Sequence, residues 1–195
     1  MSLEEKDWKY ALKAHGIQRI IPDDAKRGII LDLGCGDGSL AVTVFGKESV
    51  ERVVGVDISP NALKKAKKRI GSLVLGDATY LPFRDLIFDG VICSAVIAHL
   101  TRDQAIAALI EVHRVLTDEG FLVLLTVNRE PLKEKIMRKT KKIHCKEHIY
   151  EYSYKELKGL VENFFYITKK LGVHLNVLYS LQKHLIKYKL FFLSY

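Results

Sequence analysis

Cysteine is scarce in this chain, with three residues among 195, at Cys35, Cys93 and Cys145. An odd number of cysteines at unrelated spacings favours neither a disulfide framework nor a zinc site, so we expect free thiols. Long apolar runs are also missing, and none approaches the roughly 18 residues that a membrane-spanning helix needs. The N-terminus is charged and lacks the apolar stretch of a secretory signal peptide. We therefore expect a cytoplasmic protein without membrane contact.

No internal repeat, low-complexity stretch or linker divides the chain. Its length and its hydrophobic content of 48% suit one domain with a substantial core over residues 1–195. The sequence shows no catalytic triad, no metal-ligand cluster, and no zinc-knuckle or RRM signature of a separate RNA-binding module. The function must therefore come from motifs inside that domain.

Positive charge is in excess, with a formal net charge of +8 and an isoelectric point near 9.3. Much of it lies in Arg129–His148, where eight Lys and Arg face three Glu. Such a balance favours an acidic partner. We call residues 129–150 the basic segment. It has two open interpretations, namely substrate recognition or a solvated basic helix or loop.

The most informative stretch is Leu31–Ser39, in which three glycines follow an apolar run at the spacing Gly-x-Gly-x-Gly. Gly28–Leu33 is typical of a buried strand, and Ser39–Phe45 of a short helix. Glycines between them let the backbone turn sharply and approach a ligand closely. The pattern predicts either the first crossover of a doubly wound sheet with a nucleotide-like ligand, or a simple tight turn.

Acidic residues around this turn narrow the choice of ligand. Asp57 ends the next apolar run and lies nineteen residues after Gly38, which suits hydrogen bonds to two ribose hydroxyls. A dinucleotide site would need a third glycine where Ser39 stands. Asp32 and Asp37 would repel a pyrophosphate, so a ligand that carries an amino group fits better.

Apolar periodicity and capping residues predict alternating helices and strands along the rest of the chain. The expected later strands are Arg52–Val56, Ser72–Leu75, Asp89–Ser94, Phe121–Val127 and Phe165–Leu171. The other expected helices are Glu4–Ala14, Pro60–Ile70 after the N-cap Ser59, one from Thr101 to Gly120 with a Thr101–Gln104 capping box, one opened by a Ser153–Glu156 box, and one carrying Leu178, Leu181 and Leu185.

Four motifs in order resemble the class I S-adenosylmethionine-dependent methyltransferases. They are Leu31–Gly38 (Leu-Asp-Leu-Gly-Cys-Gly-Asp-Gly), Gly55–Ser59 (Gly-Val-Asp-Ile-Ser), Gly76–Ala78 followed by Leu81–Phe83 (Gly-Asp-Ala and Leu-Pro-Phe), and Phe88–Ile92 (Phe-Asp-Gly-Val-Ile). The resemblance implies an α/β Rossmann-like, doubly wound sheet of seven strands, mostly parallel. Its antiparallel C-terminal strand would be Lys189–Tyr195, inserted between the fifth and sixth strands.

The resemblance also implies a cofactor, S-adenosylmethionine, with S-adenosylhomocysteine as product. In the family the acid after the third strand accepts from the adenine amino group, and the next amide donates to a ring nitrogen. An aromatic residue of the N-terminal helix often touches the methionine end. The cofactor-binding residues expected on these grounds are Tyr10, Asp32, Gly34, Cys35, Gly36, Asp37, Gly38, Asp57, Ile58, Asp77, Ala78, Ser94 and His99. Tyr10, Asp77 and His99 have structural alternatives, as a core aromatic, a turn aspartate and a packed histidine.

Methyl transfer from a sulfonium needs little more than alignment of a nucleophile behind the methyl carbon. The catalytic residues are therefore open. An amine or hydroxyl acceptor would profit from a base, for which His99, His144, His148 or Tyr150 could serve, whereas a carboxylate would need none.

The acceptor is expected to be either tRNA or an acidic small molecule. Leu81–Arg84, Phe88–Asp89 and Ala95–His99 are similar to methyltransferases that esterify carboxymethyluridine at the tRNA wobble position. Positive charge also favours tRNA, and the lack of an RNA-binding module favours a small molecule. A third hypothesis is a nonenzymatic S-adenosylmethionine-binding or regulatory protein.

Overall fold

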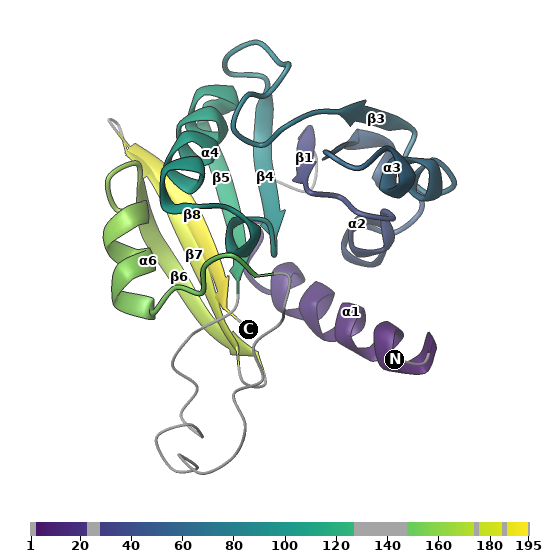
Figure 1. Ribbon diagram of the computed structural model, residues 1–195, viewed down its shortest axis with the longest axis horizontal. Coiled ribbons are helices and arrows are strands. Elements are labelled where there is room, and N and C mark those ends of the chain that lie inside the picture. The colour runs from purple at the N-terminus through teal and green to yellow at the C-terminus, as the bar shows by residue number, and fades with distance from the viewer. Residues whose placement is uncertain (1–2, 23–27, 127–147, 174–175, 185–186, 195) are drawn as a thin grey trace.

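The structure is a computed structural model that describes residues 3–22, 28–126, 148–173, 176–184 and 187–194. Its described residues form an eight-stranded sheet in the order β3-β2-β1-β4-β5-β8-β6-β7 (Figure 1). The strands are β1 (Ile30–Leu33), β2 (Val53–Asp57), β3 (Ser72–Leu75), β4 (Phe88–Ser94), β5 (Leu116–Thr126), β6 (Phe165–Val173), β7 (Asn176–His184) and β8 (Lys187–Ser194).

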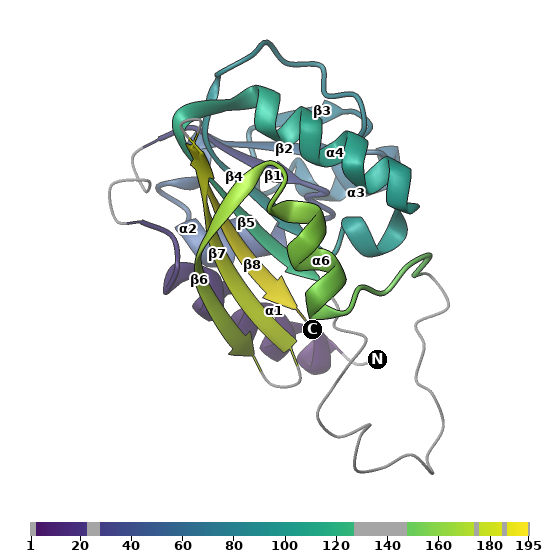
Figure 2. The same ribbon diagram turned by 90° about the vertical axis from the view of Figure 1, so that its left-hand side faces the viewer.

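Helices cover both faces of this sheet. They are α1 (Leu3–Gln18), α2 (Ser39–Phe45), α3 (Pro60–Ala66), α4 (Arg102–Val115) and α6 (Tyr154–Val161), with short 3₁₀ turns η2 (Val50–Arg52) and η3 (Ile97–His99). Figure 2 shows α4 and α6 in front of the strands, with α1 behind them. The predicted doubly wound α/β architecture is confirmed.

Two apolar clusters lie on opposite faces of the sheet, because successive side chains of a strand point to opposite faces. Leu31 and Leu33 pack in the cluster that contains the buried residues of α4 and α6. Ile30 packs in the cluster that contains those of α1, α2 and α3. Asp32 follows the alternation and lies on the Ile30 face, where its side chain is 2% exposed.

Capping residues begin the helices as the sequence predicts. The Thr101 hydroxyl accepts from the Gln104 amide at 3.3 Å, and the Gln104 side chain accepts from the Thr101 amide at 2.9 Å. Ser153 and Glu156 form the same reciprocal box at the start of α6. These bonds satisfy amide groups that have no partner inside the helix.

The helix that Thr101 opens ends at Val115, not at Gly120 as expected. Leu116 is extended and pairs with Phe88, and after an irregularity Phe121 pairs with Gly90. A Cβ at Gly90 would overlap the Phe121 ring. The strand therefore begins at the first apolar residue that the sheet can pair, and Gly120 lies within it.

The C-terminal region departs from the expectation of seven strands. The segment with Leu178 and Leu181, expected as a helix, is strand β7, which pairs antiparallel with both β6 and β8. The last strand, β8, lies between β5 and β6 as expected, but it runs parallel to both. The added strand explains this, because the chain reverses twice between β6 and β8.

Cys35 and Cys93 are buried free thiols, as the sequence predicts, and Cys145 lies outside the described residues. Burial raises the pKa of each of the two thiols to about 12. Within the described ranges, no helix combines the length and the apolar character that crossing a bilayer requires.

Candidate functional site

A cavity of about 500 Å³ opens at the carboxyl ends of β1, β2 and β4. Pockets of roughly 300–1,000 Å³ are typical of small-molecule sites, and doubly wound sheets place ligands at this edge. The lining residues are Leu33, Gly34, Val56, Asp57, Ile58, Gly76, Asp77, Ala78, Ser94, Ala95, Val96, His99, Leu100, Gln104 and Ile149.

The glycine turn forms the floor of this cavity. Gly34 has a φ of 72°, and a Cβ at this position would overlap Cγ2 of Val96. Its amide donates to the Val56 carbonyl at 2.8 Å, which holds the turn against the end of β2. The expected turn between strand and helix is present, and it requires glycine both for its dihedral angle and for its close approach to Val96, just after β4.

Asp57 stands at the end of β2 with its carboxylate held by two backbone donors. The Gly36 amide donates to Oδ2 at 2.8 Å, and the Ser59 amide donates to Oδ1 at 2.9 Å. Each carboxylate oxygen can accept more than one hydrogen bond. The carboxylate is therefore fixed in the cavity wall with capacity left for a pair of hydroxyl donors.

Asp32 lies behind the glycine turn and does not line the cavity. Its Oδ2 is buried and has no hydrogen-bond partner among the described residues. Burial, with a smaller contribution from the charge of Asp57, raises the pKa of the carboxyl to about 7. A buried carboxyl without a hydrogen-bond partner has a costly charged form. A ligand that brings a positive charge beside it would stabilise that form.

Asp77 follows β3 and takes part in a turn as well as in the cavity wall. Its Oδ1 accepts from the amide and the hydroxyl of Thr79, both at 2.8 Å. Ala78 lies beside it in the lining. The turn aspartate and the candidate ligand contact are thus the same residue.

The opposite wall follows β4. Ser94 and His99 line it, as predicted, together with Ala95 and Val96, which the sequence indicates only as part of the Ala95–His99 segment. Ala95 has a φ of 63°, an uncommon left-handed conformation for a residue with a side chain, and its amide donates to the Leu125 carbonyl at 2.7 Å. No motif in the sequence marks an alanine for such a conformation.

Several expected cofactor residues lie outside the cavity lining. Cys35 packs in the core against Gly55, where a Cβ would come within 2.9 Å of its Sγ. Asp37 accepts from the Ser39 amide at 3.0 Å and lies 3.7 Å from Arg69. Gly36, Gly38 and Tyr10 are likewise absent from the lining. The roles of these residues stay predictions.

Of the basic segment, only residues 148–150 are described. The amides of Ile149 and Tyr150 donate to the Ala98 carbonyl at 2.8 and 3.1 Å, and Ile149 lines the cavity. His144 lies outside the described residues. The end of the segment therefore contacts the cavity wall at η3, which the sequence indicates only through its charge.

A family model described as "Methyltransferase domain" matches residues 31–124, which include the glycine turn, Asp57, Asp77 and β4. The match covers just under half of the chain, which resembles the class I S-adenosylmethionine-dependent methyltransferases. Its cofactor is S-adenosylmethionine, and the Gly34 turn, the Asp57 carboxylate and the orphaned oxygen of Asp32 fit this molecule's ribose and amino groups.

Similar curated proteins include an uncharacterised protein of Methanocaldococcus jannaschii, 30% identical over 150 residues, which are 76% of this chain and 63% of that protein. Another is an uncharacterised methyltransferase of Synechocystis, 38% identical over 102 residues, covering 51% of this chain and 47% of that protein. The chain thus spans less than two thirds of the length of these relatives.

Solved structures show the same fold. A Pyrococcus horikoshii protein matches with a TM-score of 0.70 at 24% identity, over 89% of this chain and 87% of that one. A Thermotoga maritima S-adenosylmethionine-dependent methyltransferase matches at 0.66 and 24%, over 98% and 89%. The magnesium protoporphyrin IX methyltransferase of Synechocystis, solved with S-adenosylhomocysteine bound, matches at 0.64 and 18%, over 87% and 80%.

Proposed function

We propose that the chain catalyses methyl transfer from S-adenosylmethionine to an anionic acceptor. The observation that carries the proposal is the Asp57 carboxylate, held in the cavity wall by the Gly36 and Ser59 amides so that it faces a nucleoside-sized space. Asp57 and Ile58 would hold the ribose, Asp77 and Ala78 the adenine, and Gly34 and Asp32 the amino-acid end. The methyl group would then lie toward Ser94 and His99.

For this reaction the protein chiefly has to align the methyl group of the cofactor with the acceptor. The cofactor supplies a methyl carbon that its positive sulfur has already activated. Proximity and orientation of two bound reactants can lower the barrier by roughly 7–11 kcal/mol. The narrow wall of Ser94, Ala95 and Val96, fixed by the strained turn at Ala95, serves this positioning.

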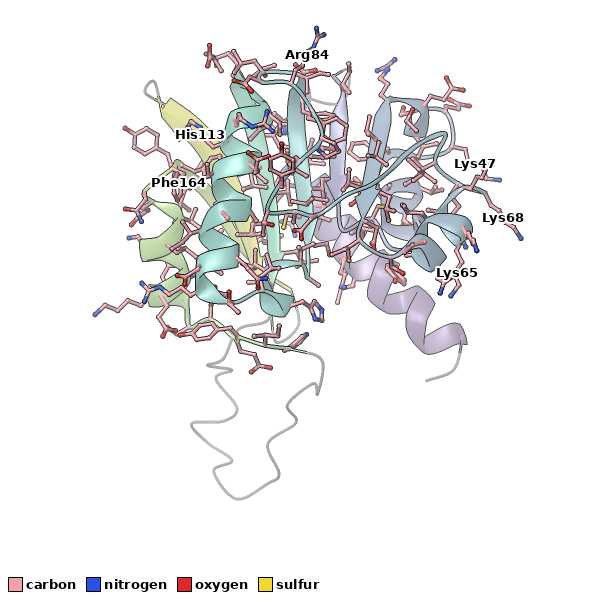
Figure 3. The ribbon with its side chains drawn as sticks, turned by 45° about the horizontal axis from the view of Figure 1, so that its top comes forward. Lys47, Lys65, Lys68, Arg84, His113 and Phe164 are labelled. Atoms are coloured by element: carbon pink, nitrogen blue, oxygen red, sulfur yellow. The ribbon has the colours of Figure 1, made fainter. Side chains whose placement is uncertain are left out.

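Charge supports an anionic acceptor, with tRNA and an acidic small molecule as the two candidates. The formal charge of +8 is concentrated in the basic segment, whose described end at Ile149 reaches the cavity. A second group of exposed lysines lies on α3 and in the turn that follows it, and it includes Lys65 and Lys68, which project into solvent in Figure 3 together with Lys47.

The test is transfer of label from methyl-labelled S-adenosylmethionine into total tRNA and, separately, into a small-metabolite extract of the source cells. We expect label in one of the two. Label in tRNA makes the basic segment an RNA contact, and label in the extract makes it part of a small-molecule site. Cofactor binding without label in either pool would favour the nonenzymatic hypothesis.

A further inference from the structure

We propose that His99 takes the proton of the methyl acceptor, that His148 and Glu151 position His99, and that the accepting group is a hydroxyl or an amine. The inference rests on the proposed methyl transfer and names its accepting chemistry. It comes from a side-chain cluster at the edge of the cavity, formed by residues that lie some fifty positions apart in the chain.

His99 ends the turn η3 and lines the cavity on the side where β4 stops. Its amide donates to the Val96 carbonyl at 2.9 Å, so its backbone is tied to the strained turn around Ala95. Besides His99, the titratable side chains of the described lining are Asp57 and Asp77, which the proposed function assigns to the nucleoside. His99 is therefore the base candidate on the acceptor side.

His148 contacts His99 from outside the cavity. The two rings are 5.1 Å apart between centroids and meet edge to face at 68°. The chain around His148 is anchored, because the next two amides, of Ile149 and Tyr150, both donate to the carbonyl of Ala98, the neighbour of His99. The contact between the rings is thus built into the way this segment packs on η3.

Glu151 completes the cluster. Nδ1 of His148 lies 3.2 Å from Oε1 of Glu151, and the two side chains are only 14% and 17% exposed. A carboxylate on one imidazole nitrogen fixes the tautomer and orientation of the ring, and it stabilises positive charge in that place. A proton taken by His99 would therefore arrive beside an imidazole that is already paired with a negative charge.

The charges of the wall argue against a carboxylate as the accepting group. The described lining holds two carboxylates and no lysine or arginine. A reacting carboxylate would find repulsion there, whereas a neutral hydroxyl or amine would find an imidazole able to accept its proton. The anionic part of the acceptor then lies away from these two carboxylates.

The step balances without a further reactant. The bond between sulfur and the methyl carbon breaks, and its electron pair stays on sulfur. The acceptor oxygen or nitrogen forms the new bond to carbon, and its proton moves to His99. Neutral S-adenosylhomocysteine, methylated acceptor and an imidazolium result.

Product chemistry tests the accepting group. The labelled product formed from tRNA or from the metabolite extract is treated with mild alkali, and volatile label is collected. Methyl ethers and methylamines keep their label, whereas methyl esters release methanol. Label that stays in the product supports the inference, and label released as methanol overturns it.

Variants test the roles of the three residues, in the same labelled-cofactor assay. We expect His99→Ala to lower the transfer rate about 100-fold or more. His148→Gln and Glu151→Gln should lower it about tenfold, at unchanged affinity for S-adenosylmethionine. Added imidazole should restore part of the His99→Ala activity. Glu151→Gln should also move the pH profile of the rate to lower pH, because a carboxylate that stabilises the imidazolium is gone.

The matched controls are His113→Gln and Glu162→Gln. His113 lies by Phe164 and Phe165 on the α4 and α6 side (Figure 3), and Glu162 pairs with Lys158 on the surface. Both should keep the wild-type rate and pH profile. Full activity in His148→Gln and Glu151→Gln with an unchanged pH profile would overturn the inference. Wild-type protein that binds no S-adenosylmethionine would overturn the proposed function as well.

Discussion

Asp32 is a carboxyl that folding removes from water, and its protonation should control stability. Its pKa rises from an ordinary 3.8 to about 7 in the folded protein, mainly through burial. The folded state therefore binds the proton more tightly than the unfolded state. This contribution is fully present below about pH 4 and is lost as the pH rises through about 7, by up to about 4 kcal/mol.

Urea unfolding of the wild type and of Asp32→Asn between pH 4 and 8 measures this effect. The variant has no titrating group at position 32, so its free energy of unfolding relative to that of the wild type should increase with pH across this window. Other groups titrate equally in both proteins, which makes the difference between them the relevant quantity. A difference that stays constant with pH would show that Asp32 ionises normally.

Asp57 should matter for cofactor binding more than for folding. Asp57→Ala removes a charged acceptor for two ribose hydroxyls, and the loss should weaken S-adenosylmethionine binding by about 3 kcal/mol, or roughly 100-fold, in a calorimetric titration. Asp118→Ala is the control, because Asp118 is exposed near the start of β5, at the other edge of the sheet. Equal affinities would remove the ribose assignment.

At the scale of elements, Arg114 connects α4 to the loop after β3. It donates to the carbonyls of Leu81 and Phe83 and to the carboxylates of Asp85 and Glu111, at 2.7 to 3.0 Å. These bonds lower the pKa of Glu111 and raise that of Arg114. The loop they hold follows the Asp77 wall of the cavity.

Arg114→Ala should lower the free energy of unfolding by about 3 kcal/mol, because it leaves two carbonyls and the largely buried Glu111 carboxylate without a cation. Urea denaturation measures the loss. Arg102→Ala, at the exposed start of α4, is the matched control and should change stability by less than about 1 kcal/mol. A similar small loss in Arg114→Ala would contradict the role assigned to this network.

Local patterns in the sequence predict the elements that local chemistry determines. The bounds of α2 and β3 are those expected, and the Thr101 and Ser153 boxes begin their helices. Gly120 misleads because glycine often ends a helix, whereas here pairing of Leu116 with Phe88 ends it earlier. Strand β7 is missed because the spacing of Leu178 and Leu181 is that of one helix face, whereas pairing with β6 and β8 makes the segment extended.

The residues of the candidate site likewise divide into those that sequence motifs mark and those that they do not. Gly34, Asp57 and Asp77 are marked by motifs, and all three lie in the cavity wall. Ala95, Val96 and Ile149 also line the cavity, and their residue types do not mark them for this position, because the path of the chain brings them there. The contact of His148 with His99 depends on packing between distant segments, which no local pattern records.

At the scale of the molecule, the position of positive charge should matter more than its amount. Reversing Lys139, Lys141 and Lys142 to Glu should spare cofactor affinity and reduce methyl transfer at least tenfold. The control reverses Lys64 and Lys65 on α3 and Lys68 in the turn after it, which changes the net charge equally. An equal loss of activity in the two variants would assign the effect to net charge alone. If the acceptor is tRNA, its binding should also weaken steeply with salt.

The most direct measurement is a crystal structure of the protein with S-adenosylhomocysteine. Our account predicts the ribose hydroxyls on the Asp57 carboxylate, the adenine beside Asp77 and Ala78, and the sulfur facing Ser94 and His99. The amino group should lie on the Asp32 side of the Gly34 turn. A ligand bound elsewhere, or a ribose that makes no contact with Asp57, would contradict it.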